Sequence, residues 1–219
     1  MMSKVKDEYR KSTAREYFES ICVAVILALF VRTFVFQAFK IPTGSMENNL
    51  LIGDHLLVNK FVFAPTATGL ERALLPIDPI RRGDILVFKY PEDPERDFIK
   101  RVIGLPGETI ELRNKKVHVN GTPIDEPYVH FLFPADDPGS GAVGGADFDV
   151  RRNYGPVTVP ADYYFMMGDN RDNSQDSRYW GFMPKDYVKG KALFVYFSFG
   201  EGPGLFNSVR WNRILHQIH

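Results

Sequence analysis

A long apolar segment near the N-terminus constrains this chain more than any other feature. From Ser20 to Phe39, every residue is apolar except Ser20, Arg32, Thr33 and Gln37. About 20 helical residues extend roughly 30 Å, which matches the hydrocarbon thickness of a bilayer. The pattern therefore predicts one transmembrane helix over 20–39. Arg32 lies near one end, where a long basic side chain can reach the headgroups.

The basic residues around this segment are distributed unevenly, which predicts an orientation. Those that precede it are Lys4, Lys6, Arg10, Lys11 and Arg15. Lys40 follows it, and the next basic residue is Lys60. The positive-inside rule then predicts a cytoplasmic tail over 1–19 and an exported remainder. A cleaved signal peptide fits less well, because no small-x-small site follows the apolar run. A buried core helix is the other alternative.

The remainder of the chain is patterned as β structure. Short runs rich in Val, Ile, Phe and Tyr are separated by Gly and Pro, as in antiparallel sheets. The runs cover 55–63, 84–90, 98–103, 109–112, 116–120 and 192–199. Asn120-Gly121 favours a hairpin turn, since both residues tolerate positive φ. We expect a mainly β fold with an antiparallel sheet or partly closed barrel.

A glycine-rich stretch indicates how the β region is divided. Residues 134–147 contain four glycines and few apolar side chains, which is typical of a surface loop. The loop falls within 109–163, which we interpret as a small, β-rich inserted cap. The main β domain then consists of 40–108 and 164–219.

The composition excludes several classes of function. The 27 basic and 27 acidic side chains balance, so the chain lacks the positive excess with which proteins bind nucleic acid. A single cysteine, Cys22, excludes an intramolecular disulfide and a cysteine-based zinc site. The histidines form no HExxH motif, so we expect no metal site.

The first block that could carry out catalysis is Ile-Pro-Thr-Gly-Ser-Met over 41–46. A serine on a glycine-containing turn can present its hydroxyl together with its own backbone N–H. A nucleophile with an oxyanion hole needs both groups. The hydroxyl candidates are Thr43 and Ser45. A membrane-proximal turn with polar caps is the alternative.

The second block, 98–103, places a lysine within an apolar strand. Alternation puts Lys100 on one face with Phe98 and Val102, and Arg101 on the other. Burial would lower the pKa of Lys100, and a lysine that is neutral near pH 7–8 can take a proton from serine. The alternative is an edge strand whose lysine points to water.

The third block, 168–178, is dense in Asp, Asn and Ser and predicts an ordered polar loop. A calcium loop is excluded when positions are counted from Asp169. The sixth position is Ser174 instead of glycine, and the twelfth is Trp180 instead of glutamate. A structural ion-pair loop and a support for a catalytic site both fit this block.

Together these blocks resemble bacterial type I signal peptidases, which are Ser/Lys proteases. The resemblance rests on 39–46, 50–54, 82–88, 98–107 and 168–178, in this order after an anchor. It implies a membrane-bound serine endopeptidase without cofactor, which removes signal peptides from secretory preproteins after small-x-small sites such as Ala-x-Ala. It also implies a single-pass protein of the bacterial cytoplasmic membrane, with its catalytic domain on the extracytoplasmic face.

The resemblance assigns roles to individual residues. Ser45 matches the nucleophile and Lys100 the general base, while the Ser45 N–H and the Thr43 hydroxyl match the oxyanion hole. Ser174 matches the hydroxyl that orients the base. The supporting ionic network would comprise Asp169, Asp176, Arg178 and Arg101.

The resemblance also implies that substrate binds as an added β-strand. Small pockets for the residues before the cut would be lined by Phe39, Ile41, Met46, Leu50, Leu56, Val87, Phe98 and Ile99. Plain hydrophobic core is the alternative for Leu50, Leu56 and Val87.

The chain departs from the pattern of this family at one place. Asn48-Asn49 stands where the family usually has Pro-Thr, which affects local rigidity rather than chemistry.

An inactive, membrane-anchored interaction protein on the same scaffold is the alternative function. A self-cleaving repressor would need a helix-turn-helix upstream, where the anchor stands instead. Phe61 and Phe63 are also expected to contact the bilayer.

Overall fold

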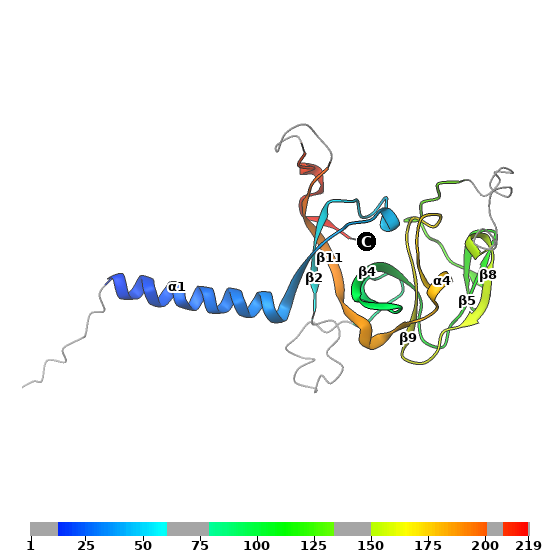
Figure 1. Cartoon of the computed structure of the whole chain (residues 1–219), viewed down its shortest axis with the longest axis horizontal. Coiled ribbons are helices and arrows are strands. Elements are labelled where there is room, and N and C mark those ends of the chain that lie inside the picture. The colour runs from blue at the N-terminus through cyan, green and yellow to red at the C-terminus, as the bar shows by residue number, and fades with distance from the viewer. Residues whose placement is uncertain (1–12, 61–78, 134–149, 201–207, 219) are drawn as a thin grey trace, which may run out of the picture.

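The computed structural model describes residues 13–60, 79–133, 150–200 and 208–218. A long helix projects from a β-rich body that is built from two antiparallel sheets (Figure 1). The mainly antiparallel β fold predicted from the sequence is therefore confirmed. Phe61 and Phe63, which we expected to contact a bilayer, lie outside the described residues.

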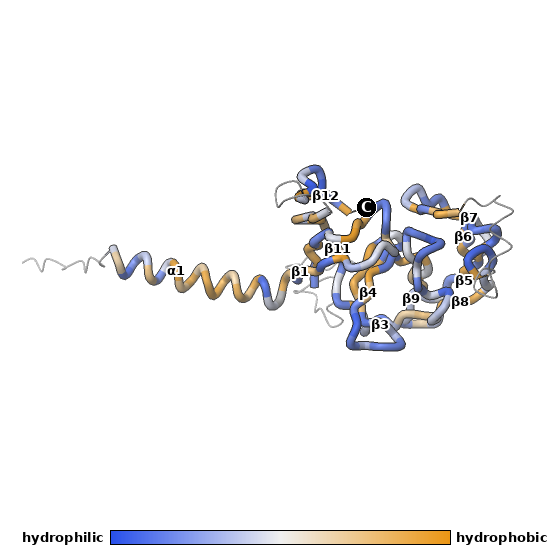
Figure 2. Tube along the Cα trace, turned by 45° about the horizontal axis from the view of Figure 1, so that its top comes forward, coloured by the Kyte–Doolittle hydropathy of each residue, from blue (hydrophilic) through white to orange (hydrophobic). Residues whose placement is uncertain are grey.

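The N-terminal helix α1 covers Thr13–Phe30 and continues as a short π-helix, η1, over Val31–Val35. α1 has no buried residue, and most of its length is apolar (Figure 2). No helix in the described ranges combines the length and hydropathy that a membrane crossing requires. The helix expected over 20–39 is wrong at its end. Phe36–Lys40 form strand β1 instead, because β2 (Asp54–Asn59) offers hydrogen-bond partners to their main chain.

The larger sheet has eight strands. Besides β1 and β2 it contains β3 (Ile85–Tyr90), β4 (Asp93–Gly104), β9 (Tyr163–Met167), β10 (Met183–Pro184), β11 (Val188–Ser198) and β12 (His216–Gln217). The order is β1-β2-β11-β3-β4-β9-β10, with β12 paired to β11. Among the described residues, the end strands β1 and β10 do not pair, so the barrel considered above does not close.

The smaller sheet has the order β7-β6-β5-β8 and lies at the far end of the body from α1 (Figure 1). Its strands are β5 (Thr109–Arg113), β6 (Lys116–Val119), β7 (Thr122–Pro123) and β8 (Tyr154–Thr158). Asn120 and Gly121 have φ angles of 51° and 80° between β6 and β7, so the hairpin turn is confirmed. All four strands fall within 109–163, the stretch interpreted as an inserted cap.

Short helical turns carry the chain between strands. They are η2 (Gly44–Met46), α4 (Ser177–Trp180), η5 (Lys185–Tyr187) and η6 (Trp211–Arg213). Apolar residues within and shortly after η2 hold this turn in the core. Met46, within η2, and Leu50, just after it, have no exposed surface, and they pack with Val87 of β3 and Ile99 of β4. This packing brings the η2 turn against the middle of the larger sheet.

Candidate active site

The serine of the first block lies on the η2 turn, over the larger sheet. Thr43 precedes the turn in extended conformation, and Ser45 is buried within it. The Asn170 backbone N–H donates a hydrogen bond of 3.1 Å to the Ser45 carbonyl oxygen. The Ser45 peptide is therefore fixed on two sides, by Met46 in the core and by the polar loop of the third block.

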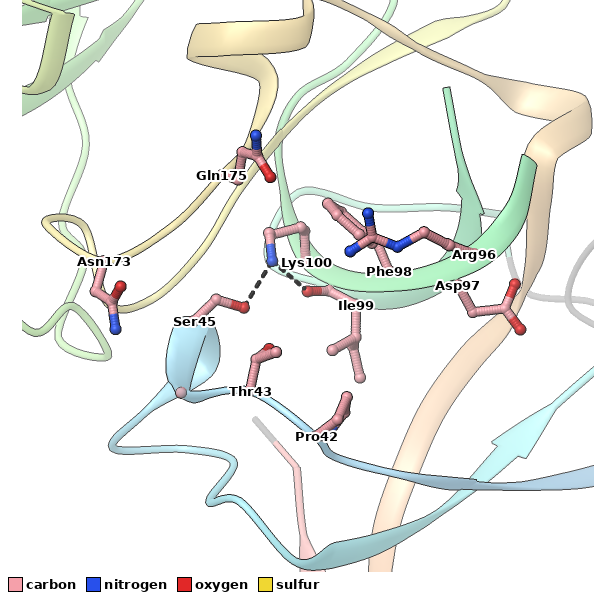
Figure 3. A pocket seen from close by; sticks show the side chains of 11 residues that line it. Pro42, Thr43, Ser45, Arg96, Asp97, Phe98, Ile99, Lys100, Asn173 and Gln175 are labelled. Carbon is pink, nitrogen blue, oxygen red and sulfur yellow. Dashed lines mark hydrogen bonds between the residues drawn. The ribbon is translucent and has the colours of Figure 1, made fainter. Parts of the chain in front are cut away.

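The lysine of the second block meets this serine directly. Lys100 lies on β4, 55 residues further along the chain, and its Nζ is hydrogen-bonded to Ser45 Oγ at 2.6 Å. The same Nζ donates to the Ile99 carbonyl at 3.1 Å. Figure 3 shows the two side chains pointing toward each other from the turn and the strand. The edge-strand alternative is wrong, because β4 is paired on both sides and Lys100 is 4% exposed.

Burial determines the protonation of Lys100. Desolvation lowers its pKa from 10.5 to about 8, against the opposing effects of the Asp176 and Asp169 carboxylates, which raise it. The Arg178 guanidinium adds a smaller lowering effect. At pH 7 about a tenth of this amine is thus unprotonated, far more than for an ordinary lysine, and the unprotonated amine can accept the serine proton.

The next residue along β4, Arg101, points the other way and has a different partner, as alternation predicted. Its guanidinium binds both carboxylate oxygens of Asp169 at 2.8 and 2.7 Å, and both side chains are buried. A third bond of 2.7 Å reaches the Gly83 carbonyl. The guanidinium also lies over the Tyr128 ring, 3.9 Å from its centroid. The start of the polar loop is therefore tied to the same strand that carries Lys100.

The end of the polar loop contains a second buried ion pair. Arg178 binds both oxygens of Asp176 at 2.8 Å. Burial alone would raise the pKa of Asp176, but Arg178 holds it below its usual value. The Ser174 hydroxyl is buried without a hydrogen bond of normal geometry, although it is near enough to Asp176 to help lower this pKa. Ser174 has no hydrogen bond to Lys100, so its role as the orienting hydroxyl stays a prediction.

A glycine allows this loop to approach the serine. A Cβ on Gly168 would lie 2.2 Å from Ser174 Oγ and 2.5 Å from the Ser45 carbonyl oxygen. Such distances are impossible, so only glycine permits the contact.

A cleft of about 470 Å³ opens at the Ser45–Lys100 pair (Figure 3). One wall is formed by 42–45, which includes Thr43, and the other by 96–100 of β4. The loop residues Asn173 and Gln175 complete the lining. Thr43, an exposed residue, therefore lines the cleft together with Ser45, and its part in an oxyanion hole stays a prediction.

The residues expected to line substrate pockets separate into two groups. Phe98 and Ile99 line the cleft, and Ile99 also belongs to the core cluster beneath it. The others belong to the core cluster beneath it: Ile41, Met46, Leu50, Leu56 and Val87, with Phe39 packed against them. They support the cleft walls, and their contact with substrate stays a prediction.

Sequence reasoning missed the partners that hold the loop from outside. Lys115 Nζ binds both oxygens of Asp172 at 3.0 and 3.1 Å, and Arg171 pairs with Glu126. Lys115 and Glu126 both come from the 109–163 stretch. The one sequence feature that indicated such partners was the density of charges in the 168–178 block. Buried charges need partners, but the sequence does not show which residues these are.

Sequence reasoning also missed the bonds around the segment that follows Ser45. Asp54 accepts hydrogen bonds from Arg213 at 2.6 and 3.1 Å and from Ser198 at 2.6 Å. Asn49, at the position where the family usually has Thr, donates a bond of 2.6 Å to Asp169. The departure at 48–49 thus adds a link between the η2 turn and the polar loop.

Comparison with known proteins identifies the family. A sequence model of the family described as signal peptidase, peptidase S26, matches residues 14–197. The chain is 36% identical to signal peptidase I of Pseudomonas aeruginosa, over 91% of this chain and 78% of the relative. It is 36% identical to signal peptidase I P of Bacillus subtilis subsp. natto, over 90% of this chain and 96% of the relative. Signal peptidase I of Aquifex aeolicus is 34% identical, over 87% of each chain. The resemblance inferred from the motifs is thereby confirmed, and the chain belongs to the signal peptidase family, peptidase S26.

Proposed function

We propose that this protein is a membrane-anchored serine endopeptidase that removes signal peptides from exported preproteins. The observation that carries the proposal is the buried Ser45–Lys100 pair, with 2.6 Å between Oγ and Nζ and a lysine pKa lowered to about 8. A nucleophile needs a base within hydrogen-bond reach whose unprotonated form is accessible near working pH, and this pair meets both conditions.

The proposed reaction begins with acylation. Unprotonated Lys100 takes the Ser45 proton while Oγ attacks the scissile carbonyl carbon. The carbonyl oxygen becomes an oxyanion, which the Ser45 N–H and the Thr43 hydroxyl would stabilise. When this intermediate collapses, the C–N bond breaks, and Lys100 returns its proton to the leaving amine of the mature protein. The signal peptide stays bound to Ser45 as an ester.

Deacylation repeats these steps with water as the nucleophile. Lys100 takes a proton from water, the hydroxide attacks the ester carbon, and Ser45 leaves with the proton from Lys100. Asp169, Asp176, Arg101 and Arg178 touch no reacting atom in this scheme. They hold the polar loop against β4 and the Ser45 peptide, which keeps the two reacting side chains in line.

The proposed substrate is an extended peptide with small residues at alternate positions before the cut. Two observations support it. The cleft lies between the chain at 42–45 and β4, so an extended peptide can bind beside both as an added strand. The floor beneath the cleft is also packed core, formed by large apolar side chains, against which small substrate side chains can lie. Cleavage after small-x-small sites follows.

The proposed anchor is α1 together with η1. Seven apolar side chains of α1 between Ile21 and Phe30 are more than half exposed, which is unfavourable in water and favourable in lipid. The basic residues before the helix favour a cytoplasmic N-terminus. The β-rich body would then lie on the extracytoplasmic face of a bacterial cytoplasmic membrane. Carbonate extraction of membranes should leave the protein in the pellet, and release into the supernatant would contradict the anchor.

The activity is tested with full-length protein in detergent and a purified secretory preprotein. We expect one new N-terminus, identified by sequencing, directly after a small-x-small site. The catalytically inactive interaction protein predicts binding of the preprotein without a new N-terminus. A product that forms equally with the Ser45→Ala protein would rule out the proposed chemistry.

A further inference from the structure

A single arginine at the mouth of the cleft is not used by the proposed mechanism. Arg96 is an exposed residue of β4 that lines the cleft together with Lys100. Strand alternation places it on the same face as Phe98 and Lys100. Figure 3 shows its side chain beside Phe98. Arg96 is thus part of the wall along which an added peptide strand would lie.

Two aromatic rings hold the Arg96 guanidinium in place. It lies 5.5 Å from the Phe98 centroid and 5.8 Å from that of Tyr90. The two rings stack on each other with centroids 4.2 Å apart and an angle of 8° between their planes. Aromatic contacts of this kind orient a guanidinium while leaving its N–H groups free to bind an acceptor.

No other charged residue of the described cleft lining pairs with Arg96. Asp97, the other charged lining residue besides Lys100, pairs with Lys189 at 2.7 Å. Lys100 is neutral when it acts as a base. Within the described part of the chain, Arg96 makes neither an ion pair nor a hydrogen bond, and the remaining lining residues are uncharged. In the working enzyme, Arg96 is therefore the charged residue of the described lining that has no oppositely charged side chain in contact.

We propose that Arg96 is a specificity-determining residue that favours preproteins with a carboxylate close to the cleavage site. The inference rests on the proposed function, because it requires a peptide in the cleft. A guanidinium donates two parallel hydrogen bonds to a carboxylate, and it repels a lysine or arginine at the same place. At a solvent-exposed site, an ion pair of this kind contributes little binding energy. We therefore expect Arg96 to produce a preference among substrates.

The test uses one preprotein in matched variants. Glu, Gln or Lys is placed in turn at each position from about five residues before the cut to two after it, the span of a strand beside 96–100. The measured quantity is the ratio of kcat/KM for the Glu and Lys substrates at each position. For the unaltered enzyme at low salt we expect a ratio of about ten at one or two adjacent positions, decreasing as salt screens the charges.

The enzyme variants separate charge from packing. Arg96→Gln should bring the ratio to about one, and Arg96→Glu should invert it. The matched control is Arg113→Gln, which removes an equal charge from an exposed position on β5 of the smaller sheet and should leave the ratio unchanged. A ratio that stays the same in Arg96→Gln overturns the proposal. An equal loss for all three substrates does so too, since it would mean that Arg96 only covers Phe98 and Tyr90. Failure of the unaltered enzyme to cleave the Gln substrate would instead count against the proposed function.

Discussion

Two lysines of this protein are buried to nearly the same extent but have opposite surroundings. Lys100 is 4% exposed and Lys115 is 5% exposed. Lys115 contacts both oxygens of the Asp172 carboxylate and the Phe133 carbonyl. Among the described residues, the hydrogen-bond partners of Lys100 are the Ser45 hydroxyl and the Ile99 carbonyl, and its Nζ also lies 5.2 Å from the centroid of the Phe98 ring. One ammonium therefore has a counter-ion in contact, and the other has none.

The comparison of the two lysines shows which feature makes a buried lysine reactive. A carboxylate in contact with a buried amine offsets part of the lost hydration of its charged form. Without a carboxylate in contact, desolvation dominates and the pKa falls. Around Lys100 the nearby carboxylates are held by Arg101 and Arg178, so they raise its pKa only in part. The arginines thus keep Asp169 and Asp176 close to the base without letting either one bind it.

The largest expected effect is on catalysis. Ser45→Ala and Lys100→Ala should each lower kcat by about 10⁴-fold or more, and the double variant should lose little beyond that, because the two groups act as one unit. Cleavage of a preprotein by full-length protein in detergent gives the rates, and circular dichroism controls for folding. Near-normal turnover in Lys100→Ala would show that both lysines are structural and would remove the contrast between them.

The next effect is on stability, at the paired lysine. Lys115→Met should lower the free energy of unfolding by about 3–5 kcal/mol, because it leaves the Asp172 carboxylate buried and unpaired. Urea unfolding followed by tryptophan fluorescence measures the change. The matched control is Lys116→Met at the exposed neighbouring position, for which we expect less than about 0.5 kcal/mol. Equal losses in the two variants would mean that the Lys115–Asp172 pair contributes nothing specific.

At the unpaired lysine the same substitution should change stability with the opposite sign. The unfolded chain holds the Lys100 proton up to a pH near 10.5 and the folded protein only to about 8, so stability falls as the pH is lowered through this window. Lys100→Met removes this cost and should stabilise the protein at pH 7 by up to about 3 kcal/mol. It should also remove the increase in stability between pH 8 and 10.5. Destabilisation comparable to that of Lys115→Met would contradict the low pKa.

The smallest effect is the pH dependence of the unaltered enzyme. Since Lys100 must lose its proton to act, kcat/KM should rise about tenfold per pH unit below about 8 and level off above it. The Lys115→Arg variant should keep this profile, because it retains the charge that pairs with Asp172. Initial rates between pH 6 and 9 measure both curves. A flat profile over this range would exclude a lysine base.

Local sequence patterns predicted the individual elements of the site, whereas the pairing of Ser45 with Lys100 was predicted only through the family resemblance. The Thr-Gly-Ser turn, the lysine within an apolar strand and the charged loop are local patterns, each produced by neighbouring residues. The partners of the loop come from other parts of the chain, such as Lys115 for Asp172 and Glu126 for Arg171. The helix end was wrongly predicted for the same reason, since pairing with β2 outweighed the apolar run over 36–39.

The amino-acid sequence was sufficient to predict the β-rich fold, the apolar N-terminal helix and the residues that could carry out catalysis. Alternation of side chains also determined that Lys100 and Arg101 have different partners, because this property belongs to any strand. The pairing of Ser45 with Lys100 was predicted through the family resemblance, and the fold confirms it; that a carboxylate contacts Lys115 but not Lys100 is visible in the folded chain alone. The physical reason is that burial and pairing set the pKa of a lysine, and both depend on residues that are distant in the sequence and adjacent only in the folded chain.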